Sequence, residues 1–284
     1  MPELPEVETI RGQLAPAVEG RTLTSLEVHD PRWCAPAAPE EVAAAAAGRR
    51  VERLGRRGKY LTWQLEGDVH LVMHLRMTGN LLLGAAGEPA RPHERVRMCF
   101  DEEQTVLFCD PRRFGTGIVL AGSEAHECYY AARLGVEPLE PEFTSDALRT
   151  LAAGRRAPVK AFLLSQERIA GVGNIYADEA LFRARIHPLR SAGSLTRRQL
   201  GDLRDAVVAS LEAGIDARGA TIDDFRHADG ARGAFQDSFL VHRREGEPCP
   251  RCGRPVVKMR AAGRGTYVCE RCQPRPRGRR APTP

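Results

Sequence analysis

Apolar residues near the N-terminus recur at intervals of three and four positions, the spacing of one face of an α-helix. The four residues on this stripe are Val7, Ile10, Leu14 and Val18. Pro5 precedes them and suits the first turn of a helix, where an N–H group has no intrahelical partner. The pattern predicts a helix over residues 5–18 that buries the stripe in a core.

The pattern changes between residues 21 and 120 to short segments with alternating apolar positions or β-branched character. These segments follow one another at about ten-residue spacing and are separated by Gly and Pro. They read TLTSLEV, RVERLGRRGKYLTWQL, VHLVMHL, RVRMCF, TVLFCDP and FGTGIVL. The series predicts an antiparallel β-sandwich or barrel, with an Ala-rich helix at about residues 39–47 inserted into it.

From about residue 144 the pattern becomes helical. Helices are predicted at 144–151, 159–164, about 174–183 and 196–213. Thr144 can cap the first helix, and Thr196 with Gln199 forms a capping box for the last. The two glycines of the segment IAGVGN permit a tight helix–turn–helix connection between the middle pair. We therefore predict an α+β fold with a β-rich half and a helical half.

Composition and the N-terminal sequence exclude a membrane protein and argue against export. A chain of 284 residues with 42% hydrophobic residues can form two domains without disulfide support. It contains no run of about 18 apolar residues. The opening MPELPEVE is acidic and lacks the basic and apolar parts of a secretory signal. We expect a cytoplasmic protein.

Positive charge is concentrated toward the C-terminus. The formal net charge is +5, but residues 243–284 alone hold twelve basic and three acidic residues. The rest of the chain is therefore slightly acidic. A basic segment on a near-neutral body favours binding to a polyanion such as nucleic acid. For the Pro-rich stretch QPRPRGRRAP a solvated tail is the alternative.

Four cysteines have the spacing of a zinc site. Cys249, Cys252, Cys269 and Cys272 form C-x2-C-x16-C-x2-C. Two such CxxC turns can fold a β-hairpin around one tetrahedral Zn²⁺ ion. Because cysteines would fill every coordination position, this zinc would be structural and would perform no chemistry. The alternative of two disulfides needs an oxidising compartment, for which the sequence has no export signal.

Common catalytic motifs are absent from the sequence, which has no HExxH, P-loop or G-x-S-x-G. The N-terminus offers different chemistry. A small second residue commonly allows removal of Met1, which would leave Pro2 as a free secondary amine. Since an α-amino group titrates near about pH 8, part of it would be an uncharged nucleophile able to attack an aldehyde-level carbon. Glu3 could shuttle protons. On these residues alone, N-terminal processing is the simpler interpretation of Pro2.

Five ordered blocks carry a family resemblance. They read PELPEVETIRGQL, HLRMTG, DPRRFG, IAGVGNIYADEALFRARIHP and REGEPCPRCG…GRGTYVCERCQ. These blocks resemble the bacterial formamidopyrimidine-DNA glycosylase family, to which endonuclease VIII is related. The resemblance implies an N-terminal β-sandwich catalytic domain at 2–135 and a helix–two-turn–helix DNA-binding domain at 136–235. A zinc finger would follow at 240–274, then a disordered basic tail at 275–284.

The resemblance implies roles in catalysis for four residues. Pro2 would attack the sugar C1′ of the damaged nucleotide, expel the base and form a Schiff base, while Glu3 would donate and accept protons. Lys59, in RRGKYL, would assist β-elimination and contact phosphate. Arg264, in GRGTYVC, would grip the lesion phosphate and assist δ-elimination. The expected product is a gap with phosphate at both ends.

The resemblance also implies contacts with DNA, because a base must leave the duplex before an amine can reach its sugar. Met77 would fill the vacated space, Arg112 would pair with the orphaned cytosine and Phe114 would wedge the opposite strand. Asn174, at the IAGVGN turn, would bind phosphate together with backbone N–H groups. The other residues at DNA-contacting positions are His74, His93, Arg155 and Lys160.

Two positions depart from the family pattern. Asp223 stands where a basic residue is common, in a loop that covers the everted base. His242 replaces a tyrosine that usually touches phosphate. Both changes leave the expected catalytic residues intact and bear on substrate range.

The function implied is a DNA glycosylase/AP lyase for oxidised purines, principally 8-oxoguanine opposite cytosine and formamidopyrimidines, in base excision repair. It would act as a monomer on double-stranded DNA at the bacterial nucleoid, with one structural Zn²⁺ and no membrane partner. One alternative is an endonuclease VIII-like enzyme for oxidised pyrimidines, against which Arg112 and Phe114 argue. Another is a zinc-hairpin DNA-binding protein without catalysis, which would require neither Pro2 nor Lys59.

Overall fold

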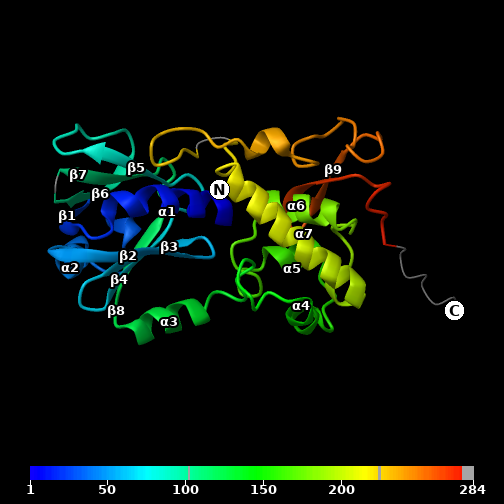
Figure 1. The fold of residues 1–284 in the computed structure, drawn as a ribbon, viewed down its shortest axis with the longest axis horizontal. Coiled ribbons are helices and arrows are strands. Elements are labelled where there is room, and N and C mark those ends of the chain that lie inside the picture. The colour runs from blue at the N-terminus through cyan, green and yellow to red at the C-terminus, as the bar shows by residue number, and fades with distance from the viewer. Residues whose placement is uncertain (102, 223–224, 277–284) are drawn as a thin grey trace. The chain divides into compact units, whose positions relative to one another are not determined.

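The chain divides into two compact units in the structure, a computed structural model that describes residues 1–101, 103–222 and 225–276. The first unit comprises residues 1–133 and 214–236. The second comprises residues 134–213 and those from 237 onward. Figure 1 labels most of the helices and strands of the two units.

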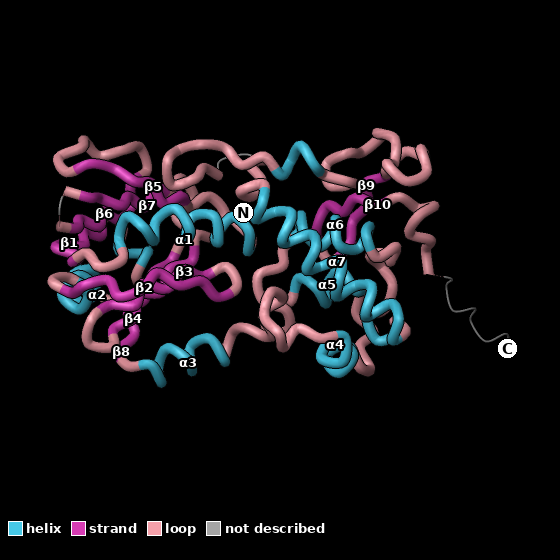
Figure 2. Tube along the Cα trace, viewed as in Figure 1, coloured by secondary structure: helices cyan, strands magenta, loops and turns pink. Residues whose placement is uncertain are grey.

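The first unit begins with helix α1 (Leu4–Val18), whose four predicted stripe residues are fully buried. Eight strands follow it: β1 (Thr22–Val28), β2 (Arg49–Arg57), β3 (Tyr60–Leu65), β4 (Val69–His74), β5 (Asn80–Ala85), β6 (Glu94–Phe100), β7 (Gln104–Cys109) and β8 (Thr116–Ala121). All of the predicted strands are confirmed, and β5 is an addition. Figure 2 shows the strands gathered in this unit, with α1 against them.

The strands pair antiparallel in the order β5-β7-β6-β1-β2-β3-β4-β8. Between β1 and β2 the pairing is short, with Leu23 opposite Arg49 at its end, so the series separates into two four-stranded layers. Trp63 on β3 stacks on Phe100 of β6, with ring centroids 5.9 Å apart. The apolar core therefore lies between the layers, as predicted for a sandwich.

Shorter helices complete the first unit. They are the 3₁₀ turn η1 (Pro31–Trp33), the predicted Ala-rich helix α2 (Pro39–Ala46) and helix α3 (Ser123–Ala131). Two residues of the segment 214–236, Arg226 and Ala228, bond to the strands through their backbone. The N–H of Leu83 donates to the carbonyl of Ala228 at 2.8 Å, and the N–H of Arg226 donates to the side-chain oxygen of Asn80 at 2.7 Å.

The second unit contains the predicted helices and a hairpin. Its helices are α4 (Ser145–Ala152), α5 (Val159–Leu164), α6 (Asn174–Arg183) and the beginning of α7 (Arg197–Asp216), and all four predictions are confirmed. The hairpin pairs β9 (Val257–Ala261) with β10 (Arg264–Val268). Two 3₁₀ turns, η2 (Ala192–Ser194) and η3 (Phe235–Ser238), complete the set of elements. In the described part of the chain, no helix combines the length and the apolar character needed to cross a membrane.

Candidate functional site

The predicted nucleophile lies just before helix α1. Pro2 is buried, whereas Met1 is 42% exposed. Glu3 is the N-cap residue of α1, and its N–H donates to the carboxylate of Glu6 at 2.8 Å. The same buried carboxylate accepts the N–H of Ala220 at 2.7 Å. Glu6 thus fixes the start of the helix and ties it to segment 214–236 of the same unit.

Lys59 lies in the two-residue turn that joins β2 to β3. The first turn residue, Gly58, has φ of 57°, whereas φ of Lys59 is not positive. This is the pattern of a type II′ hairpin turn, which favours Gly at its first central position. Lys59 is only 4% exposed, so its ammonium is held in a largely enclosed environment.

His74 lies on β4 near this lysine. Burial, together with the positive charges of Arg76 and Lys59, lowers the pKa of His74 to about 3. Its Nδ1 atom accepts the N–H of Arg76 at 2.9 Å. The imidazole is therefore neutral at physiological pH, and a role as a cationic phosphate ligand would require a large change in its surroundings.

Asp110 organises the loop that carries Arg112 and Phe114. Its fully buried carboxylate accepts the N–H groups of Phe114 and Gly115, both at 2.8 Å, and that of Arg112 at 3.2 Å. The guanidinium carbon of Arg112 lies 4.8 Å from the ring centroid of Phe114, which is 51% exposed. A buried anchor thus presents an exposed cation–π pair.

The same aspartate joins this loop to two others. The hydroxyl of Thr78 donates to Asp110 Oδ1, and the N–H of Asp110 donates to the carbonyl of His93 at 2.9 Å. Met77, which precedes Thr78, is half-buried, and His93 is exposed. The first unit therefore brings together the loops of Met77, His93 and the Arg112–Phe114 pair.

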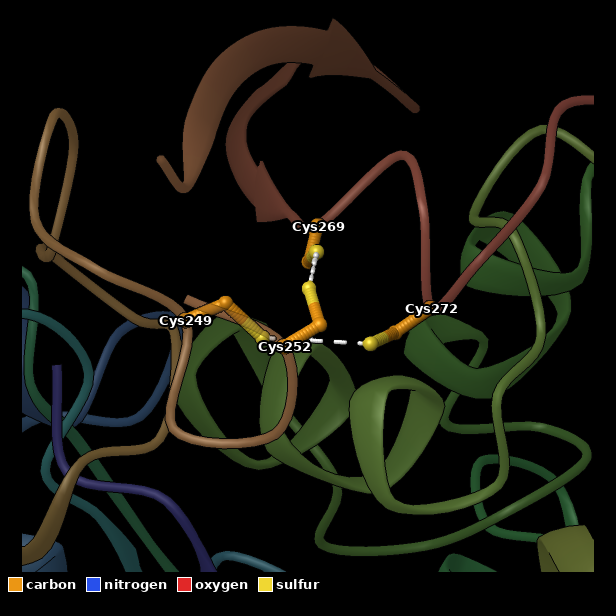
Figure 3. Close-up of side chains that lie close together, drawn as sticks. All are labelled: Cys249, Cys252, Cys269 and Cys272. Carbon is orange, nitrogen blue, oxygen red and sulfur yellow. Dashed lines mark hydrogen bonds between the residues drawn. The ribbon is translucent and has the colours of Figure 1, made fainter. Parts of the chain in front are cut away.

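The zinc ligands converge in the second unit. Cys249 and Cys252 lie on one turn, Cys269 and Cys272 on another, and Figure 3 shows their sulfurs facing one another. All four Sγ atoms lie within 4.8 Å of one another, including pairs at 3.5 and 3.9 Å. Tetrahedral Zn–S bonds of about 2.3 Å require S–S separations of about 3.8 Å. The site fits one structural Zn²⁺, as predicted.

Arg264 begins strand β10, directly after the turn Ala262–Gly263. Both turn residues have positive φ, the pattern of a type I′ hairpin turn. The Arg264 side chain is exposed, and its guanidinium has no hydrogen bond or ion pair with the described residues. The zinc-stabilised hairpin can therefore present this cation to an anionic ligand.

Lys160, which was predicted to contact DNA, is fully buried. Its Nζ atom donates to Asp178 Oδ1 and to Thr266 Oγ1, both at 2.7 Å, and lies 3.4 Å from the carbonyl of Gly265. The ammonium donates to Asp178 of helix α6 and to Thr266 of strand β10, so it joins these two elements. Its direct contact with DNA stays a prediction.

Asn174 contacts the same strand from the first position of helix α6. Its Nδ2 atom donates to the carbonyl of Gly265 at 3.1 Å. Asn174 is thus adjacent to the Arg264 hairpin.

Arg155 lies elsewhere in this unit, where its Nε atom donates to the carbonyl of Leu151 at 2.5 Å. It borders a cavity of about 460 Å³ whose other basic residues are Arg156 and Arg168.

The two departures from the family pattern have different outcomes. Asp223 lies outside the described residues, as do residues 277–284 of the predicted tail. His242 is buried, and its Nδ1 atom lies 2.9 Å from Asp178 Oδ2. This histidine therefore joins the polar cluster of Lys160 and Asp178.

Three buried carboxylates that hold the predicted residues in place were missed by the sequence interpretation. They are Glu6, Asp110 and Asp178. Each lies inside a quoted motif, in PELPEVE, DPRRFG or NIYADEA. Their presence within these motifs was a signal, but each also has at least one partner far away in the sequence.

Comparisons with known proteins agree with this arrangement of a β-sandwich, a helix–turn–helix pair and a zinc hairpin. Family models match in chain order: the formamidopyrimidine-DNA glycosylase N-terminal domain at residues 1–117, its H2TH domain at 134–226, and a zinc finger found in FPG and IleRS at 246–275. The formamidopyrimidine-DNA glycosylase of Geobacillus kaustophilus is 43% identical over 274 residues, covering 96% of this chain and 100% of that protein.

Solved structures give the same result. The MutM (Fpg) protein of Thermus thermophilus is 44% identical with a TM-score of 0.84, covering 96% of this chain and 98% of that one. A Lactococcus lactis Fpg variant, in complex with Fapy-dG-containing DNA, is 32% identical with a TM-score of 0.90, covering 96% and 100%. By fold, the protein is a two-unit β-sandwich and helix–two-turn–helix protein with a four-cysteine hairpin. It belongs to the formamidopyrimidine-DNA glycosylase family.

Proposed function

We propose that the protein is a bifunctional DNA glycosylase/AP lyase that excises oxidised purines from duplex DNA and then cleaves the strand in base excision repair. The observation that carries the proposal is the N-terminus. In a chain of this family, Pro2 lies next to Glu3, the N-cap residue of helix α1, and removal of Met1 would leave the Pro2 amine free. The preferred bases would be 8-oxoguanine opposite cytosine and formamidopyrimidines.

The first chemical step would be nucleophilic attack. The lone pair of the Pro2 amine forms a bond to the sugar C1′ while the glycosidic bond breaks, and the departing base takes up a proton. The C1′–O4′ bond of the sugar ring then breaks, O4′ takes up a proton, and an iminium ion links the protein to the opened sugar. Glu3, the next residue, would donate and accept the protons of ring opening.

Strand cleavage would follow by two eliminations. Loss of the C2′ proton breaks the C3′–O bond, and a second elimination breaks the C5′–O bond, so that both ends of the gap carry phosphate. Lys59 would assist the first elimination and contact a phosphate. Arg264, on the zinc-stabilised hairpin, would bind the lesion phosphate and assist the second. The zinc holds the hairpin and takes no part in bond breaking.

Contacts with the duplex would come from the exposed loops. Met77 would occupy the space left by the flipped nucleotide, while Arg112 and Phe114 would contact the orphaned cytosine and the opposite strand. The burial of Asp110 beneath the last two residues supports this assignment, because a wedge must be held rigidly to keep a duplex open. His93 and Asn174 would add DNA contacts, with Arg155 as a further candidate.

The proposal includes a monomer that works in the bacterial cytoplasm at the nucleoid. Support for a monomer comes from the chain itself, which carries all four proposed catalytic residues. The relatives come from bacteria, and a solved structure of one of them contains Fapy-dG-containing DNA.

Single-turnover kinetics on two otherwise identical duplexes tests this proposal. One duplex holds 8-oxoguanine opposite cytosine and the other holds thymine glycol. We expect faster release of 8-oxoguanine, followed by a gap with phosphate at both ends. Faster removal of thymine glycol would replace the oxidised-purine assignment by the oxidised-pyrimidine one. Tight binding to both duplexes without base release would instead indicate a non-catalytic DNA-binding protein.

A further inference from the structure

An ion pair connects the helix that follows Pro2 with the turn that carries Lys59. Arg56 lies near the end of β2, two positions before Gly58. Its Nε atom donates to Glu8 Oε2 of helix α1 at 2.9 Å. Its Nη1 atom donates to the carbonyl of Gly58, the first turn residue, at 3.2 Å. One guanidinium thus contacts both the helix and the turn.

This ion pair is shielded from solvent and uses one oxygen of Glu8. The side chain of Arg56 is 9% exposed and that of Glu8 is 22% exposed. The other oxygen, Oε1, accepts two hydrogen bonds from Arg11, at 2.6 and 2.8 Å. Arg11 lies about one turn further along α1. Glu8 therefore has an internal partner on its own helix and a second partner on the hairpin.

The charges of this cluster persist at neutral pH. Burial raises the pKa of the Glu8 carboxyl, but the Arg11 hydrogen bond and the Arg56 charge outweigh it, so this pKa lies below its ordinary value. Arginine stays protonated throughout the accessible range. The link between α1 and β2 is therefore a charge-assisted hydrogen bond at working pH.

The position of the two-residue turn determines where the Lys59 side chain begins. A contact that holds the turn therefore bears on the position of the Lys59 amine. Helix α1 is fixed by its fully buried apolar stripe. Two amines that act on one sugar need alignment to within about 1 Å, since a displacement of that size can lower a rate about a hundredfold.

We propose that Arg56, held by Glu8, is a positioning residue that sets the turn of Lys59 relative to the Pro2 end of helix α1. This inference rests on the proposed function, in which Pro2 forms the iminium and Lys59 assists the elimination that follows. Arg56 would act through the turn, without touching the substrate or the reacting atoms. Its effect should fall on the Lys59-dependent step.

The test separates the two chemical steps in single turnovers with excess enzyme. Base release from an 8-oxoguanine duplex reports on Pro2, and cleavage of a duplex with a preformed abasic site reports on elimination. For Arg56→Gln we expect elimination to slow by about ten- to a hundredfold. We expect base release to change by less than about threefold, so the ratio of elimination rate to base-release rate should fall. A purely structural role would lower both steps together with the melting temperature.

Arg11→Gln is the matched control, because it removes the other guanidinium from Glu8 and leaves the link to the turn intact. We expect the wild-type ratio for this variant. The Lys59→Ala background supplies the second control. If Arg56 acts through Lys59, adding Arg56→Gln to that background should leave elimination as it was in Lys59→Ala alone.

If Arg56→Gln does not fold, Arg56→Lys replaces it as the test variant. Lysine keeps the charge but has no planar fork to reach Glu8 and the Gly58 carbonyl together, so we expect partial recovery of elimination. The inference would be overturned if both Arg56 variants kept the wild-type ratio of elimination rate to base-release rate. It would also be overturned if Arg56→Gln slowed elimination as much in the Lys59→Ala background as in the wild-type protein. Absence of both chemical steps in the wild-type protein would instead refute the proposed function.

Discussion

The hydroxyl of Thr78 donates a hydrogen bond to the buried carboxylate of Asp110. This contact joins the loop that begins with Met77 to the loop of Arg112 and Phe114. The residues proposed to enter the duplex come from separate parts of the chain, and one aspartate holds them together. Rigidity of the wedge therefore depends on a side chain that need not touch DNA.

Replacing this aspartate should uncouple the loops. Asp110→Asn keeps the shape but loses the charge and turns one acceptor into a donor that faces backbone N–H groups. We expect the free energy of unfolding to fall by about 2–3 kcal/mol and base release to slow at least about tenfold. Urea denaturation and single-turnover kinetics measure the two effects. Asp202→Asn, at a half-exposed position, is the control, and equal results for the two variants would refute the role of Asp110.

Removal of one zinc ligand should disrupt the hairpin. A structural zinc supplies about 10–16 kcal/mol of binding free energy in isolated zinc-finger peptides, so the turns cannot keep their geometry without it. We expect Cys269→Ser to lose zinc and to bind an abasic-site duplex much more weakly. Zinc released on denaturation and DNA affinity are the measurements. Cys128→Ser, at an exposed position outside the cluster, should retain both, and a Cys269→Ser protein that retains zinc would contradict the assignment.

The Arg264 side chain should matter independently of zinc. Arg264→Ala removes the guanidinium and leaves all four cysteines in place. We expect full zinc content, weaker DNA binding and at least about tenfold slower strand cleavage, because a phosphate contact is lost. Arg271→Ala removes the same charge from the same zinc module at another exposed position. If that control loses as much cleavage as Arg264→Ala, the effect is general electrostatics and Arg264 has no special position.

Stability should respond to acid through His74. Its pKa is about 3 in the folded protein and about 6.5 in the unfolded chain, so below about pH 6.5 the unfolded chain binds more protons. Folding should therefore lose about 2 kcal/mol from this residue between pH 7 and pH 5. Denaturation at both pH values should show this loss in the wild-type protein and a smaller one in His74→Asn. Equal pH dependence in the two proteins would place His74 in a more open environment.

Much of the fold could be predicted because its hydrophobic pattern is regular. The stripe on helix α1 and most of the strands follow directly from apolar spacing. Strand β5 was missed because Leu81, Leu82 and Leu83 are consecutive and show no alternation. Helix α3 was missed because Tyr130 is its only buried residue, so no apolar stripe marks it.

The sequence allowed candidate site residues to be named, but it did not indicate the contacts that support them. The residues proposed for catalysis lie in motifs that a family resemblance can locate. Their supports join distant parts of the chain: Arg56 and Glu8 are 48 positions apart, and Asp110 and Thr78 are 32 apart. Such pairings depend on strand order and helix docking, and no local pattern encodes them. For the same reason, the burial of Lys160 became clear only once β10 was placed beside it.

The central claim is that the amine of Pro2 becomes covalently bound to the damaged sugar. Borohydride reduces an iminium to a stable amine, so it should trap a protein–DNA complex when added to the wild-type protein and an 8-oxoguanine duplex. We expect mass spectrometry to locate the adduct on a proline that has lost Met1, and Pro2→Gly to trap far less. Trapping of Pro2→Gly at the wild-type level, or an adduct located on a lysine, would contradict the account.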